Sequence, residues 1–201
     1  MLTDSQILHL LAQCEAAAGR LLPEIRGNLQ GRDWLSALWE LVVIDAAAQI
    51  GKIGYEISTP GGARPDLFVE IYSGKRLWIE AAFAFEQSQG SITRSAEHRV
   101  FRILREKADK AKRAAVEEPF VVCIGTDRVF SFGPSHAQSE VGRDRAVYDF
   151  FEKSQSLSAA IIVPVLLRPE VLVGFARDAR PTLFKNQRKA LPTEVDFIIS
   201  N

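Results

Sequence analysis

The spacing of apolar residues predicts helices near the N-terminus and in the middle of the chain. Apolar positions recur every three or four residues over Thr3–Gly19 and Asp33–Ile50, which is the period of a helix packed on one face. Residues between these helices include helix breakers, so we expect irregular chain there: Pro23, Gly27 and Gly31. Two later segments also have a helical pattern, the highly charged Glu97–Val116 and the shorter Asp144–Ser154.

Short apolar or alternating segments predict the strands. In chain order they are Tyr55–Ser58, Asp66–Tyr72, Arg76–Phe83, Phe120–Gly125, Arg128–Phe132 and Ala159–Leu166. The second and third strands are expected to form a hairpin that turns around Ser73-Gly74-Lys75. The tail is expected to be irregular, with strand-like pieces at Val171–Ala176 and Val195–Ile199.

The order of these elements predicts an α/β protein with a mixed central β-sheet flanked by helices. A chain of 201 residues is long enough for one domain of ordinary size. We therefore expect a single domain over residues 1–201, with its core at about 33–166. The helix at 3–19 and the tail at 169–201 are expected to be additions to that core.

Composition and charge restrict the class of protein. Lys and Arg together equal Asp and Glu at 25 each, which excludes a strongly basic nucleic-acid binder but still permits local basic patches. No run of 18 apolar residues is present, so no membrane span is expected. The N-terminus lacks the pattern of a secretory signal, and Cys14 and Cys123 match no metal-binding spacing. These features favour a cytoplasmic protein.

Candidate chemistry centres on three acids: Glu40 on the second predicted helix, Asp66 at the start of the hairpin and Glu80 on its second strand. If the turn centres on Gly74, residue 66 pairs with 82 and residue 68 pairs with 80, which puts Asp66 and Glu80 on one face. Two close carboxylates repel one another, and a divalent cation relieves that repulsion. Hard oxygen ligands suit Mg²⁺ or Mn²⁺, either of which activates water and neutralises phosphate charge.

At these residues the chain resembles the PD-(D/E)xK nuclease-like superfamily. The resemblance is carried by Leu38-Trp39-Glu40-Leu41, Arg64-Pro65-Asp66-Leu67-Phe68-Val69 and Leu77-Trp78-Ile79-Glu80-Ala81-Ala82. It implies a restriction-endonuclease-like core in which Asp66, Glu80 and the Ala81 carbonyl hold the metal ion. It also implies that Glu40 completes the site.

One position departs from the pattern of that superfamily. A lysine is expected two residues after the second acid, where this chain has Ala82. Either the basic group has moved to the following helix, which offers Lys107, Lys110 and Arg105, or the lysine is lost and the protein binds without cutting. Lys107 is the first choice for a relocated catalytic lysine, and Lys110 the second.

Two open alternatives concern the basic residues and the acids. The helix that carries Arg99, Arg102 and Arg105, together with Arg64, is either a surface that contacts nucleic-acid phosphates or a solvated face. A solvated face would carry pairs four residues apart, such as Glu106–Lys110 and Asp109–Arg113.

The three acids also have structural alternatives. They are exposure to solvent for Glu40, bonding to local amides for Asp66 and pairing with an arginine such as Arg64 for Glu80.

The function expected from the resemblance is metal-dependent hydrolysis of DNA phosphodiester bonds, with Mg²⁺ or Mn²⁺ as cofactor. The alternative is a catalytically inactive nuclease-fold module or a subunit of a larger nucleic-acid-processing or defence complex. The expected partner is nucleic acid, and the resemblance implies DNA; no membrane partner is expected. A homodimer or a larger complex is compatible with both alternatives.

Overall fold

The computed structural model describes residues 4–84, 96–126, 147, 149–168, 171–175 and 182–196. Its helices are α1 (Asp4–Ala18), α2 (Pro23–Leu29), α3 (Trp34–Ile50) and α4 (Ala96–Ala114), with a 3-10 helix at Thr193–Asp196. Its strands are β1 (Gly51–Tyr55), β2 (Leu67–Ile71), β3 (Arg76–Ala84), β4 (Phe120–Thr126), β5 (Ala159–Arg168), β6 (Val171–Phe175) and β7 (Thr182–Lys185). Residues 147 and 149–153 are also helical.

The strands form a mixed sheet in the order β1-β2-β3-β4-β5-β6, and β7 also pairs with β5. The pairs β1–β2 and β2–β3 are antiparallel, whereas β3, β4 and β5 run parallel to one another. Helix α4 lies in the connection between the parallel strands β3 and β4. The predicted α/β class with a mixed sheet and flanking helices is confirmed.

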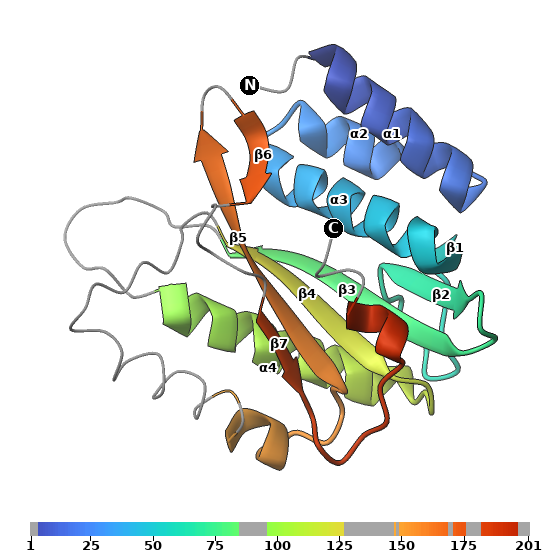
Figure 1. The fold of residues 1–201 in the computed structure, drawn as a ribbon, viewed down its shortest axis with the longest axis vertical. Coiled ribbons are helices and arrows are strands. Elements are labelled where there is room, and N and C mark those ends of the chain that lie inside the picture. Colours follow the sequence, from blue (N-terminus) through green and yellow to red (C-terminus); the bar gives the residue numbers. More distant parts are fainter. Residues whose placement is uncertain are drawn as a thin grey trace.

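Two apolar clusters cover the two faces of the sheet. The first joins α1, α2 and α3 to one set of alternate strand residues, including Leu77, Ile79, Val121 and Cys123. The second joins α4 to the other set, including Trp78, Phe120 and Val122. Figure 1 shows α1, α2 and α3 on one side of the sheet and α4 on the other. Alternation along β3 therefore decides which helix each of its side chains meets.

Several predicted elements differ from the structure. The first strand is wrong in place: β1 continues directly from α3 and ends at Tyr55, because Glu56 has a left-handed φ of 49° that ends the strand. The irregular stretch after α1 contains α2, since Pro23 is at the start of that helix, where its missing N–H costs nothing. Strand β7 falls in the tail expected to be irregular.

Of the predicted strand at 195–199, residues 195 and 196 belong instead to the 3-10 helix, and the rest lies outside the described residues. The predicted strand Arg128–Phe132 lies outside the described residues. No helix among the described residues is long and apolar enough to cross a membrane.

The hairpin register also differs from the expected one. Phe68 pairs with Trp78 and Leu67 with Ile79, so the pairing is displaced by two residues from the predicted one. The turn lies one residue earlier than assumed: Ile71 is opposite Lys75, whose carbonyl accepts from the Ile71 N–H at 2.8 Å, and Gly74 within the turn has a φ of 84°. Because the displacement is even, every side chain keeps its predicted face.

Candidate functional site

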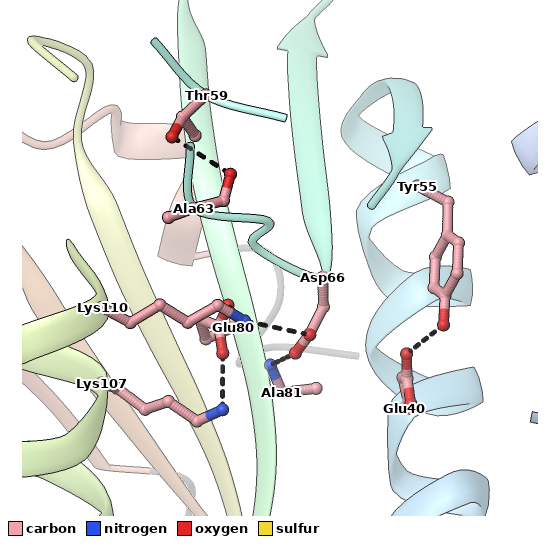
Figure 2. A network of polar contacts seen from close by, with 9 residues as sticks. All are labelled: Glu40, Tyr55, Thr59, Ala63, Asp66, Glu80, Ala81, Lys107 and Lys110. Atoms are coloured by element: carbon pink, nitrogen blue, oxygen red, sulfur yellow. Dashed lines mark hydrogen bonds and ion pairs between the residues drawn. The ribbon is translucent and has the colours of Figure 1, made fainter. Parts of the chain in front are cut away.

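Glu80 is the centre of a buried group of charges. It lies in the middle of β3, its side chain has 0% exposure, and alternation with Ile79 directs it toward α4. Lys107 Nζ lies 2.6 Å from Glu80 Oε2, and Lys110 Nζ pairs with Glu80 Oε1. Both lysines extend from α4 toward β3 in Figure 2. The low dielectric of a buried site makes these ion pairs strong and an unpaired charge costly.

The two lysines reach the same carboxylate because they are three residues apart on one helix. Residues at that spacing lie on the same helix face, and here that face is directed at β3. Their side chains are 15% and 22% exposed, so the alkyl stems are largely covered while the ends keep some contact with solvent. Burial tends to lower the pKa of Lys107, but the adjacent carboxylates, Glu80 first, outweigh it and raise that pKa.

Asp66 is the second acid of this group. It precedes β2 directly, its Oδ2 accepts a 2.8 Å hydrogen bond from the Ala81 N–H, and its Oδ1 lies 3.8 Å from Lys110 Nζ. Burial, followed by repulsion from Glu80, raises the pKa of Asp66 to about 6. We call Asp66, Glu80, Lys107 and Lys110 the carboxylate–lysine cluster. One ammonium group, that of Lys110, contacts both acids.

A loop fixes Asp66 relative to α4. Its turn is closed by Thr59, whose N–H and hydroxyl both donate to the Ala63 carbonyl, at 2.8 and 3.1 Å (Figure 2). The Gly61 N–H donates to the Ala114 carbonyl at the end of α4, at 3.1 Å. A Cβ on Gly61 would lie 1.8 Å from the Arg113 carbonyl oxygen, so this close approach needs glycine.

Glu40 lies on α3, apart from the lysines, and is hydrogen-bonded rather than solvated. The Tyr55 hydroxyl donates to Glu40 Oε1 at 2.7 Å (Figure 2). Burial and then the charge of Asp66 raise the pKa of Glu40 to about 7. Sequence reasoning missed Tyr55. A signal was available, since a buried tyrosine generally places its hydroxyl against a polar partner.

The predicted arginines do not converge on the acids. Arg64 Nε donates to Ser58 Oγ at 3.3 Å, so the expected pairing of Arg64 with Glu80 is wrong, and lysines take that place. Arg102 and Arg105 are exposed on α4, whereas Arg99 is half-buried.

The solvated-face interpretation of α4 is wrong for two of its lysines, Lys107 and Lys110, which both pair with Glu80. Lys110 pairs with Asp66 and Glu80 and not with Glu106, as that interpretation expected. Neither Glu106–Lys110 nor Asp109–Arg113 is among the ion pairs of the described residues. Helix α4 therefore has an inward basic face in addition to its exposed one.

The donor types at the cluster fit a hard divalent cation. No group of three His, Cys, Asp or Glu side chains close enough to hold a metal ion occurs within the described part of the chain. Mg²⁺, however, is commonly held by one or two carboxylates and completed by water and phosphate oxygens. Asp66 and Glu80 already share one cationic group, the Lys110 ammonium, and Asp66 is bonded to the backbone of Ala81. A metal ion would thus take over a position now held by Lys110.

Comparison of the chain with family models, with curated proteins and with solved structures found no match.

Proposed function

We propose that this protein is a metal-dependent nuclease with a relocated catalytic lysine. The observation that carries the proposal is the contact of one ammonium, Lys110, with both Asp66 and Glu80, next to a second lysine, Lys107. Ala82 lies on the same face of β3 as Glu80 and supplies no amine, but two amines reach that carboxylate from α4. The resemblance to the PD-(D/E)xK superfamily supports the same assignment.

The residues that would hold Mg²⁺ or Mn²⁺ are Asp66, Glu80 and the carbonyl of Ala81. When bound, the ion supplies an activated water and neutralises charge on a phosphate oxygen. The chain itself contributes the orientation of Asp66, which is fixed by the Ala81 N–H, and an ammonium donor for the phosphate. Lys107 is held at Glu80 with a raised pKa, so it stays protonated at neutral pH and can donate to a phosphate oxygen. Glu40, on α3, would contact water bound to the ion or hold a second ion.

The test is nicking of supercoiled plasmid by purified protein with Mg²⁺, with Mn²⁺ and with EDTA. We expect metal-dependent nicking by the wild type and none by Asp66→Asn, whose amide oxygen still accepts from the Ala81 N–H. Glu70→Gln is the matched control, because Glu70 is an exposed acid on the same hairpin. Absence of nicking by folded wild-type protein with either metal overturns the proposal, as does retained nicking by Asp66→Asn.

The second candidate is a non-catalytic nuclease-fold module that binds nucleic acid. It is favoured by the charge balance of the cluster, in which two lysines already neutralise two acids without a metal ion. Folded wild-type protein that binds DNA in a gel-shift assay, but does not nick it, would identify this second function.

A further inference from the structure

A second basic site lies on a different stripe of α4 from the carboxylate–lysine cluster. An open groove of about 800 Å³ separates this stripe from residues 150–156. Arg105, Asp109 and Lys112 line it from α4, at the four- and three-residue spacings that form one stripe of a helix. Lys107 and Lys110 belong to the stripe that meets β3, so the groove and the cluster are separate.

The groove carries an excess of positive charge. Lys153 and Lys189 line it from the other side, so among the described residues the groove has four basic side chains against one acid, Asp109. Arg105, Lys112 and Lys153 take part in none of the ion pairs between described residues. Lys189 Nζ donates to the Ser156 carbonyl at 3.1 Å, a neutral partner that leaves its charge uncompensated. An anion in the groove would meet several cations and little repulsion.

The rest of the lining suits a planar, partly apolar ligand. The half-buried ring of Phe150 stands in the groove beside small apolar residues of α4, Ala108 and Ala111 among them. Aromatic rings beside basic side chains are a common arrangement for nucleotides, because the base stacks while the phosphate meets the cations. Burial lowers the pKa of Lys189, which an adjacent phosphate would counteract.

We propose that this groove is a nucleotide-phosphate binding site, formed by Lys112, Lys153, Lys189 and Arg105 around Phe150. The ligand is either a free nucleotide or the backbone of a single-stranded polynucleotide. Binding at this groove requires neither a metal ion nor the acids of the carboxylate–lysine cluster. The inference therefore goes beyond the proposed nuclease activity and can be tested in its absence.

The experiment measures binding in EDTA, so that no cleavage contributes. A labelled 20-nucleotide oligothymidylate is titrated by fluorescence anisotropy, and adenosine monophosphate by calorimetry. The variant is Lys112→Ala/Lys153→Ala, and the matched control is Lys52→Ala/Arg32→Ala, which removes two exposed basic residues away from the groove. We expect about a tenfold loss of affinity in the groove variant only, because two exposed ionic contacts are removed.

The two probes distinguish the two ligand sources. For the oligonucleotide, the logarithm of the binding constant decreases with the logarithm of the salt concentration. The slope of that line should be less steep by about 1.4 in the groove variant, since two phosphate contacts are lost. A loss confined to adenosine monophosphate would assign the groove to free nucleotides. Equal affinity of both double variants for each probe, or no binding of either probe by the wild type, overturns the inference.

Discussion

Replacement of Glu80 by Gln tests whether the buried charges of the cluster hold the fold together. The substitution keeps the size of the side chain but removes a negative charge that contacts both Lys107 and Lys110, as no other acid does in the described part of the chain. Glu80 itself is fully buried, whereas the two lysines keep 15% and 22% exposure and can turn partly toward water. The loss should therefore be near the lower limit of the cost of breaking a buried ion pair, about 3 kcal/mol of unfolding free energy.

The assay is urea denaturation at pH 7, followed by circular dichroism. A loss of about 3 kcal/mol is a large part of the 5–15 kcal/mol that is typical of a domain, and it lowers the midpoint by roughly 1–3 M. Glu70→Gln is the control, since Glu70 is 51% exposed and its pairing distance to Arg76 is 4.0 Å. That change should cost less than about 1 kcal/mol. Equal midpoints for Glu80→Gln and Glu70→Gln would refute the reasoning.

A triple variant separates the value of the pairing from the cost of an orphaned charge. Lys107→Met/Lys110→Met leaves Glu80 buried without a cation and should destabilise more than Glu80→Gln. Adding Glu80→Met removes that orphaned charge and should recover most of the stability, because an apolar replacement of a buried ion cluster is often neutral. A triple variant less stable than the double variant would contradict this account.

Three further predictions concern Glu40, Tyr55 and the loop before β2. Burial raises the pKa of Glu40 from 4.5 to about 7, so the folded state keeps a proton that the unfolded state releases. The unfolding free energy should therefore fall as the pH rises from 4.5 to 7. In denaturation series at several pH values, Glu40→Gln should reduce that fall by roughly 2–3 kcal/mol. The same fall in the wild type and the variant would contradict the raised pKa of Glu40. Tyr55→Phe removes the donor to Glu40 Oε1 and should lower the unfolding free energy by about 1 kcal/mol, measured by urea denaturation at pH 8. A urea midpoint equal to that of the wild type would argue against the hydrogen bond. Gly61→Ala places a Cβ against the backbone of α4 and should lower the unfolding free energy by about 1–3 kcal/mol. Gly27→Ala is the control, since Gly27 has open space around it in α2, and it should be neutral or stabilising. Thermal melts of the two variants measure the difference. Equal melting temperatures for the two alanine variants would show that the loop does not need its close approach.

The elements that could be predicted are those whose local pattern and tertiary environment agree. Helix α3 and strands β4 and β5 are buried along most of their described length, so their apolar residues identify them directly. The position of β1 depended on something not visible in its own residues. It continues from α3 without a turn, because Gly51 pairs with Ile71 of β2 at close range. A Cβ on Gly51 would lie 2.4 Å from the Glu70 carbonyl oxygen, so this pairing needs glycine. The start of β1 therefore depends on contacts with β2, which the residues of β1 alone do not reveal.

The sequence by itself determined that Asp66 and Glu80 share a face of the sheet, because side chains alternate with a period of two and the error in register was even. It also indicated that the following helix is rich in basic residues. It offered Lys107, Lys110 and Arg105 as groups that could reach the acids, and only the tertiary structure decided that both lysines turn inward while Arg105 stays exposed. The parallel connection from β3 to β4 lays α4 over Glu80, and the burial of that carboxylate then requires cations, which Lys107 and Lys110 provide.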